Sequence, residues 1–344
     1  MAYTTIKKAS DYFNTVLYTG NGSTQSITGV GFQPDLTWLK RRSADGYHFW
    51  TDAVRGVTKT IYSNVTDAEV TKSNGLTAFG TDGFTVGSDA DINGNGQTHV
   101  GWSWLASNTT ASNTDGSITS TVSANTTSGF SIVSYTGTGS AGTIGHGLSS
   151  VPKIIIVKNR SSTTDWYVYT EMTNNTHSML LNSTSAKVGP YSDNWNNTSP
   201  TSSVFSVGSS SSTGGASGNN MIAYCFAEKK GFSKFGSYTG NGSTDGSFCY
   251  LGMKPKFIMI KRTDSTGDWV IYDGVKEPYN VIDTYLEANS SNADVTLAVR
   301  ELDILSNGFK VRGTNVSINA SGSPYIYMAF AEEPLVGDNP ATAR

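Results

Sequence analysis

Six residues near the middle of the chain resemble a cofactor-binding motif. Residues 137–142 read Gly-Thr-Gly-Ser-Ala-Gly, which matches the glycine fingerprint of dinucleotide-binding folds. In those folds a helix begins directly after the last glycine, because its N-terminus holds the pyrophosphate. The residues that follow, Thr143 to Gly147, cannot form such a helix. We therefore interpret the motif as a turn and expect no cofactor.

Asp89, Asp91 and Asn93 resemble the first half of a calcium-binding loop. They place oxygen ligands at alternate positions and are followed by Gly94, where such a loop turns sharply. The twelfth position is Val100 instead of the bidentate glutamate, and no flanking helices are predicted. The sequence favours a polar hairpin without a metal ion, with a weak calcium site at these three residues as the alternative.

Residues that could act in catalysis are few and scattered. Glycoside hydrolysis needs a pair of carboxylates, whereas Asp52, Glu171 and Asp273 are spaced about 100 residues apart and give one acid at a time. We expect no enzyme activity; a polysaccharide depolymerase remains an alternative if distant carboxylates form a pair. None of the paired spacings of a zinc site occurs among the four histidines, His48, His99, His146 and His177.

One loop favours ligand binding. Residues 189–200 place Tyr191 and Trp195 among asparagine and aspartate residues, including Asp193 and Asn196. A sugar ring can stack on an exposed aromatic side chain, a contact of about 1 kcal/mol, while carboxylate and amide groups bind its hydroxyls. Tyr191, Asp193, Trp195 and Asn196 are therefore the candidate ligand-binding residues. The alternative is that both aromatic side chains fold back over the edge of the protein.

All of these residues belong to a unit of roughly 100 residues that occurs three times. It opens with Tyr-Thr-Gly-x-Gly-Ser, at residues 18–23, 135–140 and 238–243. A proline then precedes an apolar run that ends in lysine, at residues 34–40, 152–158 and 255–261. An aromatic strand, a Phe-x-Val motif and a final aromatic-rich strand follow in the same order. Landmarks that recur at near-constant spacing indicate an internal repeat.

Composition predicts an all-β fold for these units. Glycine accounts for 37 of 344 residues, charged residues make up only 15%, and apolar residues occur in short runs bounded by Gly, Asn, Ser and Pro. We predict three tandem antiparallel β-sandwich domains of jelly-roll or concanavalin-like type, each closing its own hydrophobic interior. The expected boundaries are an N-terminal arm at 1–11, repeat 1 at 12–106, a linker with a strand at 107–128, repeat 2 at 129–228, repeat 3 at 229–334 and a tail at 335–344.

Charge and hydropathy exclude several classes of function. The net charge of −3 and the pI of about 5.8 lack the basic footprint of a nucleic-acid-binding protein. The chain contains neither an apolar run of transmembrane length nor a secretory signal, so we expect a protein made in the cytoplasm that does not insert into membranes. Cys225 lies in an apolar strand and is expected to be a buried thiol. Lys40 ends an apolar run and is expected to enter solvent.

Several phrases of the sequence are similar to a tandem module of phage virion proteins. They include Gly-Phe-Ser-Ile-Val-Ser-Tyr-Thr-Gly at 129–137, Ala-Tyr-Cys-Phe-Ala-Glu at 223–228 and Tyr-Ile-Tyr-Met-Ala-Phe-Ala-Glu at 325–332. The module resembled occurs in tail-fibre and other structural proteins of tailed bacteriophages, marine ones especially, and is a lectin-like sandwich of uncharacterised function. The resemblance covers nearly the whole chain and assigns no catalytic or binding residues.

The resemblance implies a virion surface protein that is synthesised in the host cytoplasm. The first expectation is a non-enzymatic tail fibre or adhesin that contacts host surface polysaccharide, and the alternative is a structural protein that decorates the capsid or forms a neck or head fibre. Residues 1–11 are expected to contact other virion proteins. A homo-oligomer is expected, with a trimer as one candidate, although no coiled-coil heptads specify three chains.

Overall fold

The computed structural model describes residues 4–337 and 340–342, and their strands form three large and three small sheets. The first large sheet contains β1 (Phe13–Thr19), β9 (Thr98–Trp104), β3 (Leu36–Arg41), β4 (Phe49–Asp52), β5 (Lys59–Tyr62) and β6 (Val70–Thr71), in that order. The second contains β10 (Ala111–Asn113), β11 (Ser120–Asn125), β12 (Phe130–Thr136), β18 (Asn220–Phe226), β14 (Ile154–Asn159), β15 (Tyr167–Thr170) and β16 (Met179–Leu180). The third contains β19 (Ser233–Thr239), β27 (Pro324–Pro334), β21 (Met253–Arg262), β22 (Trp269–Asp273), β23 (Thr284–Glu287) and β24 (Val295–Thr296).

The small sheets follow the same threefold pattern. They contain β2 (Gln25–Thr28), β8 (Gly83–Val86) and β7 (Leu76–Gly80), then β13 (Gly142–Gly145) and β17 (Val204–Val207), and finally β20 (Phe248–Tyr250), β26 (Gly308–Val311) and β25 (Leu302–Leu305). The strand pairs of all these sheets are antiparallel, which confirms the prediction of an antiparallel all-β fold.

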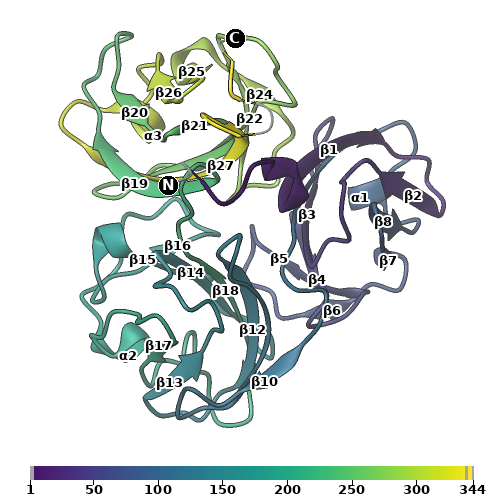
Figure 1. The fold of residues 1–344 in the computed structure, drawn as a ribbon, viewed down its shortest axis with the longest axis vertical. Coiled ribbons are helices and arrows are strands. Elements are labelled where there is room, and N and C mark those ends of the chain that lie inside the picture. Colours follow the sequence, from purple (N-terminus) through teal and green to yellow (C-terminus); the bar gives the residue numbers. More distant parts are fainter. Residues whose placement is uncertain (1–3, 338–339, 343–344) are drawn as a thin grey trace.

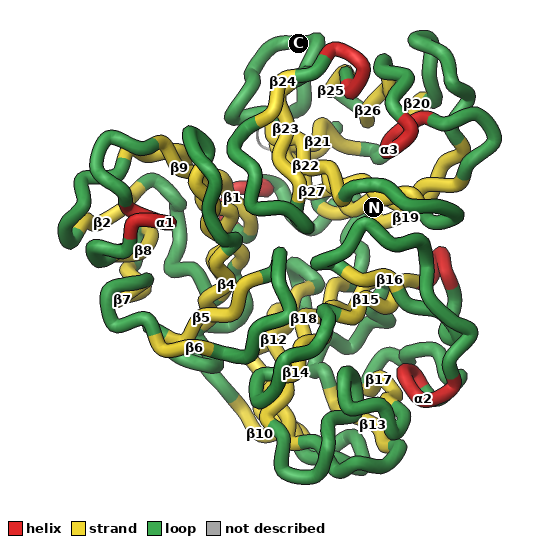
Figure 2. The backbone as a smooth tube through the Cα atoms, turned by 180° about the vertical axis from the view of Figure 1, so that it is seen from behind, coloured by secondary structure: helices red, strands yellow, loops and turns green. Residues whose placement is uncertain are grey.

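Helices in the described residues are single turns, as the backbone tube in Figure 2 makes clear. They are α1 (Ala90–Asn93), α2 (Ser192–Trp195), α3 (Val316–Asn319), η1 (Ala9–Asp11), η2 (Glu171–Thr173) and η3 (Ala298–Arg300). No helix in this part of the chain has the length and apolar character needed to cross a bilayer. Residues 107–128, expected to be a linker with a strand, contribute β10 and β11 to the second large sheet.

Strand registers show that the large sheets are built alike. In each, the strand at the landmark proline pairs with the last strand of the repeat. The residue two positions after the proline pairs in the same way in all three, Leu36 with Trp104, Ile154 with Phe226 and Phe257 with Phe330. This register makes Trp104, Phe226 and Phe330 equivalent residues. The three sheets stand around one centre (Figure 1).

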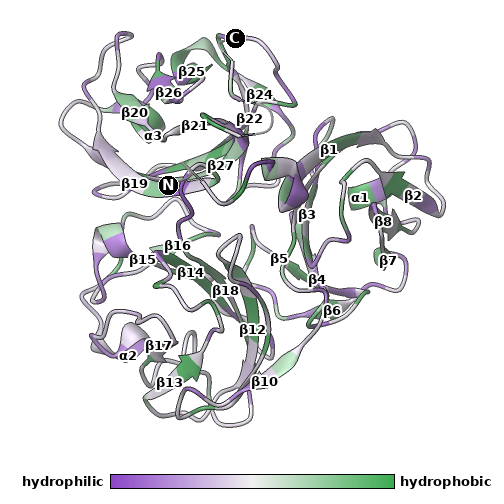
Figure 3. Ribbon diagram, viewed as in Figure 1, coloured by the Kyte–Doolittle hydropathy of each residue, from purple (hydrophilic) through white to green (hydrophobic). Residues whose placement is uncertain are grey.

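Side chains of the large sheets alternate between two cores, because successive residues of a strand point to opposite faces. Leu39 and Phe49 pack with Phe84 of a small sheet in a hydrophobic cluster inside repeat 1. Trp38 and Trp50, their neighbours on β3 and β4, belong to a second and larger cluster. Strands β12, β14 and β18 of repeat 2 are likewise strongly hydrophobic (Figure 3), with one face in the cluster inside that repeat and the other in the larger cluster.

The larger cluster is shared by all three repeats. Trp104, Phe226 and Phe330 meet in it, with ring centroids 6.4 Å apart for Trp104 and Phe226, 5.5 Å for Trp104 and Phe330, and 5.9 Å for Phe226 and Phe330. The interior of repeat 3 is continuous with it, since Phe309 of its small sheet belongs to the same cluster. The expectation of three separate interiors is therefore wrong. Apolar faces that three independent domains would expose to water are instead buried against one another.

The opening phrase of each repeat forms a turn, and its tyrosine side chain anchors that turn by a hydrogen bond. The hydroxyl of its tyrosine donates to a backbone carbonyl, from Tyr18 to Ile92 at 2.6 Å and from Tyr238 to Ile318 at 2.6 Å. In repeat 2, Tyr135 donates to Thr213. The motif at residues 137–142 connects β12 and β13, so the interpretation as a turn is confirmed.

The N-terminal arm packs on its own chain. Thr4 donates to the carbonyl of Lys230 at 2.6 Å, and Ile6 and Ala9 are buried. Phe13, where β1 begins, stacks on Phe330 with ring centroids 5.0 Å apart. Residues 4–13 therefore connect repeat 1 to repeat 3. Residues 1–3 of the expected arm and 338–339 and 343–344 of the expected tail lie outside the described residues.

Candidate functional site

The three lysines that end the apolar runs are buried between repeats. Lys40, Lys158 and Lys261 have no exposed surface, so the expectation that Lys40 enters solvent is wrong. Each ammonium group donates to one carbonyl in its own repeat and one in another. The Nζ atom of Lys40 lies 2.9 Å from the carbonyl oxygen of Gly46 and 2.7 Å from that of Ser291. For Lys158 the distances are 2.6 Å to Thr164 and 2.8 Å to Thr66. For Lys261 they are 2.5 Å to Gly267 and 2.8 Å to Thr184.

These contacts close a ring. Lys40 of repeat 1 reaches repeat 3, Lys158 of repeat 2 reaches repeat 1, and Lys261 of repeat 3 reaches repeat 2. Burial lowers the pKa of each lysine to about 8, because an ammonium group loses hydration and finds carbonyl oxygens but no carboxylate at bonding distance. A lysine with a lowered pKa can act as a nucleophile, but these three are enclosed by backbone and serve as bonds between repeats.

His48 occupies the position equivalent to Trp166 and Trp269. The residues that follow them, Phe49, Tyr167 and Val270, pair with equivalent positions of the preceding strand. Those two indoles donate across the interfaces, from Trp166 to the carbonyl of Tyr62 at 2.9 Å and from Trp269 to that of Leu180 at 2.8 Å. The Nδ1 atom of His48 accepts a hydrogen bond of 2.8 Å from a neighbouring indole. Burial, together with the charge of a nearby lysine, places its pKa well below the usual value. His48 is thus a neutral packing residue.

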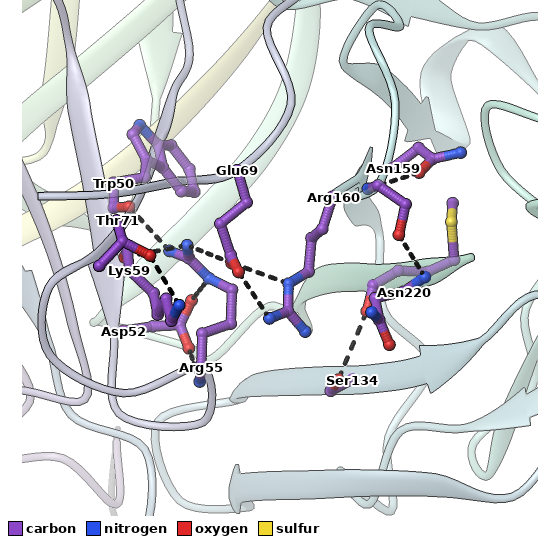
Figure 4. A network of polar contacts seen from close by, with 12 residues as sticks. Trp50, Asp52, Arg55, Lys59, Glu69, Thr71, Ser134, Asn159, Arg160 and Asn220 are labelled. Atoms are coloured by element: carbon purple, nitrogen blue, oxygen red, sulfur yellow. Dashed lines mark hydrogen bonds and ion pairs between the residues drawn. The ribbon is translucent and has the colours of Figure 1, made fainter. Parts of the chain in front are cut away.

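A buried network joins repeats 1 and 2 (Figure 4). The Asp52 carboxylate accepts from the guanidinium of Arg55 at 2.5 Å and from the Tyr224 hydroxyl of repeat 2 at 2.7 Å. Glu69 bridges two arginines, with 3.2 Å to Arg55 and bonds of 2.8 and 2.9 Å to Arg160 of repeat 2. Every charge in this network has an opposite charge in contact. The arrangement is that of a structural ion-pair network rather than a catalytic acid.

Asp273 is the equivalent of Asp52 in repeat 3 and is also satisfied by another repeat. Its Oδ2 atom accepts from Thr15 at 2.9 Å and from the Trp102 indole at 2.6 Å. Glu171 lies at the surface and pairs with Lys153 at 3.2 Å. The three acids that recur in the sequence therefore have separate sets of partners.

Two other carboxylates do lie together in repeat 3. Asp268 and Glu287 contact the same guanidinium, that of Arg300, at 2.8 and 2.7 Å. Burial raises the pKa of Glu287, and the charge of Asp268 adds to this effect. For Asp268, hydrogen bonds from Asn289 and Arg300 outweigh the cost of burial and lower its pKa. Because Arg300 bonds both acids and lies over the ring of Tyr285 at 4.7 Å, this group is an ion triad.

The predicted binding loop does not present both of its aromatic residues. Trp195 is only 1% exposed and packs in the interior of repeat 2, where its indole donates to the Ser178 hydroxyl at 2.8 Å. Its prediction as a stacking residue is wrong. Tyr191 is 49% exposed, and Asp193 and Asn196 are exposed beside it. The loop contains α2, a single helical turn. Trp195 at the end of α2 is buried, whereas Tyr191 before it and Asp193 in its first turn are exposed.

The residues of the candidate calcium loop have other partners. Asp89 caps α1 by accepting from the Asp91 amide at 3.0 Å and pairs with Lys72 at 3.3 Å. Asp91 pairs with Arg41 at 3.2 Å. The side chain of Asn93 donates from Nδ2 to the carbonyl of Gly87 at 2.7 Å, and its Oδ1 accepts from the backbone of the opening turn of repeat 1. Within the described ranges no group of three His, Cys, Asp or Glu side chains could hold a metal ion.

An open cleft at the junction of repeats 2 and 3 was not predicted. It has a volume of about 500 Å³ and lies where β19 begins and β20 ends. Phe248 and Tyr250 of β20 are 47% and 57% exposed. They alternate with buried Cys249, so the signal in the sequence was a strand with aromatic residues at positions where the other repeats have Ser, Thr or Gly. Cys225 and Cys249 are buried free thiols, as expected for Cys225.

Together, the sheets and their contacts define an all-β protein in which three repeats are bonded into a ring. The chain belongs to the family described as a domain of unknown function (DUF7483), whose model matches residues 8–334. The match includes all three repeats. No curated protein matches the chain.

Proposed function

We propose that each repeat is a two-layer β-sandwich whose large sheet also packs against those of the other two repeats. The hydrophobic clusters inside repeats 1 and 2 support this view, because each joins a large sheet to a small one. The buried lysines favour a fixed arrangement over flexible beads, since each bonds two repeats at once. Such a fold is a rigid platform that carries loops on its outside.

The platform serves as a non-enzymatic virion surface protein of the tail-fibre or adhesin type, with host surface glycans as its ligands. One observation carries this proposal. The buried acids and bases hold the repeats together, whereas aromatic and polar side chains of the kind that contact sugars, Tyr191, Asp193 and Asn196 among them, lie outside. The resemblance of the repeats to phage virion modules supplies the setting. Contacts of low affinity gain strength when many copies act on one particle.

A capsid-decorating or neck protein is the second candidate. The packing of Ile6, Ala9 and Phe13 against the body of the protein favours it, because an arm folded onto its own chain is not an extended fibre anchor. Contact with other virion proteins then involves the exposed side of the arm, which includes Lys8. A trimer of chains is not needed to complete a threefold arrangement, since one chain contains three repeats. A depolymerase has less support because Arg300 bonds the paired acids.

Adsorption measurements test the proposal. Purified protein added to host cells should bind them and compete with whole particles for adsorption, and it should release no reducing ends from host polysaccharide. Particles that lack the protein should adsorb poorly if it is an adhesin. If such particles adsorb normally but lose their capsids more easily on heating, the decorating role is correct and the adhesin role is wrong.

A further inference from the structure

The cleft at the junction of repeats 2 and 3 has the composition of a small-ligand site. It is lined by Glu228, Ser233 and Lys234, which we call the polar wall, by Tyr250, which we call the aromatic wall, and by Lys230, Leu251 and Gly252. Its volume of about 500 Å³ lies within the range of roughly 300–1,000 Å³ that is typical of ligand pockets. Polar groups and an aromatic ring that line the same cleft can bind a molecule with both hydroxyl groups and an apolar face.

The polar wall is held in place before any ligand arrives. The two oxygens of Glu228 have separate partners: Oε1 accepts from Lys234 at 2.7 Å, while Oε2 accepts from the Phe235 amide at 3.4 Å and lies 3.6 Å from Lys153. The Glu228 side chain nevertheless keeps 21% of its surface exposed. A carboxylate has more acceptor positions than these contacts use. Glu228 is therefore fixed and can still accept a hydrogen bond from a ligand.

Comparison of the repeats shows that the aromatic wall is not required by the fold. Strand registers make Phe248 equivalent to Ser26 and Thr143. Each of the three pairs with the middle residue of the Phe-x-Val motif in its own repeat. The same registers make Tyr250 equivalent to Thr28 and Gly145. The residue between them is buried in every repeat, as Ile27, Ile144 and Cys249.

Repeat 3 thus keeps the buried central residue and places exposed rings at two positions that hold Ser, Thr or Gly in the other repeats, where Gly145 of repeat 2 is buried. The same architecture forms with small residues at these positions in repeats 1 and 2, so packing does not explain two large exposed rings. Residues two apart on a strand stand about 7 Å from each other on one face. Two rings at this spacing beside the cleft extend its aromatic wall along β20.

We infer that this cleft binds a saccharide, with the Tyr250 ring stacked on the apolar face of a pyranose and Glu228 and Lys234 bonded to its hydroxyls. Phe248 then contacts the next sugar of the chain. The inference rests on the glycan contact proposed above and locates it at the junction of repeats 2 and 3 rather than in the loop of Tyr191. A simple anion is a poorer match because the Lys234 and Lys153 charges are already paired with Glu228.

Exposed aromatic residues allow a clean test. Binding of the full-length protein to gluco-, galacto-, manno-, xylo- and chito-oligosaccharides and to oligogalacturonate should be measured by ligand-observed NMR. Tyr250→Ala should weaken binding of the recognised saccharide about five- to tenfold, and Tyr250→Phe should retain most of it. Tyr279→Ala is the matched control, since Tyr279 lies in the same repeat and is 80% exposed; it should have no effect. Glu228→Gln should also weaken binding, with circular dichroism to verify folding.

The outcomes separate this inference from the proposed function. Saccharide binding that Tyr250→Ala leaves unchanged, or wild-type protein that binds none of the panel, would overturn the cleft as a saccharide site. Neither result alters cell adsorption, which is measured independently. The opposite outcome is also informative. If Tyr250→Ala loses saccharide binding but the wild-type protein does not bind cells, the cleft is a saccharide site and the adhesin role is wrong. Loss of binding in Tyr191→Ala alone would assign the glycan to the loop of repeat 2.

Discussion

The buried lysine ring gives this protein an unusual dependence of stability on pH. Lys40, Lys158 and Lys261 have pKa values of about 8 in the folded chain, against about 10.4 for an unfolded lysine. Between these values the unfolded state binds more protons than the folded state, so the free energy of unfolding rises as pH increases. Below pH 8 both states are charged and the folded state carries the full cost of burial.

The size of the effect follows from the two pKa values. Between pH 7.5 and 9.5 one such lysine would add about 2 kcal/mol to the free energy of unfolding, and roughly half of that if water reaches the ammonium group. Three lysines should therefore add about 3–5 kcal/mol in all. Above pH 10 the trend should reverse, because burial raises the pKa of several tyrosines, including Tyr18 and Tyr238, and the unfolded state then loses protons first.

Urea unfolding monitored by tryptophan fluorescence tests this reasoning. Wild-type protein should become more stable from pH 7.5 to 9.5, and Lys158→Met should show a rise smaller by about 1–2 kcal/mol. Lys187→Met is the matched control, since Lys187 is exposed in the same repeat, and it should follow the wild type. A flat or falling curve for the wild type, or equal slopes for Lys158→Met and Lys187→Met, would refute the argument.

Three further substitutions probe individual contacts. Arg160→Ala should lower the free energy of unfolding by about 1–3 kcal/mol in urea titrations, because it breaks two bonds of 2.8 and 2.9 Å to Glu69 between repeats; no loss would exclude a stabilising role. Burial raises the pKa of Asp35 to about 6, so its ionisation should lower the free energy of unfolding by up to about 3 kcal/mol as pH rises from 4 to 7. Asp35→Asn should remove this fall in stability, and identical pH profiles for the variant and the wild type would contradict the prediction. Trp195→Phe should lower the thermal midpoint through loss of its 2.8 Å bond to Ser178, worth about 1 kcal/mol, without weakening saccharide binding; weakened binding in a folded variant would return Trp195 to the candidate site.

Several features of the protein could be predicted from the sequence because they depend on local chemistry. Short apolar runs between Gly, Asn, Ser and Pro produce strands wherever they occur, so the antiparallel all-β fold was predictable. Recurring landmarks such as Pro34 and Lys40 mark equivalent strand positions because each repeat needs the same turn and the same central strand. The turn at residues 137–142 was predictable for the same reason, since no helix could follow it.

Contacts between distant segments were decided only by the tertiary structure. Trp38 and Trp50 are as hydrophobic as Leu39 and Phe49, and nothing in their identity indicates that they face other repeats instead of their own interior. In the sequence Lys40 has the pattern of a surface residue, and only the fold supplies its two carbonyl acceptors from different repeats. Trp195 and Tyr191 differ by a single helical turn, yet one is buried and the other exposed. Sequence periodicity determines which face a residue shares with its neighbours, whereas burial depends on what other parts of the chain place against that face.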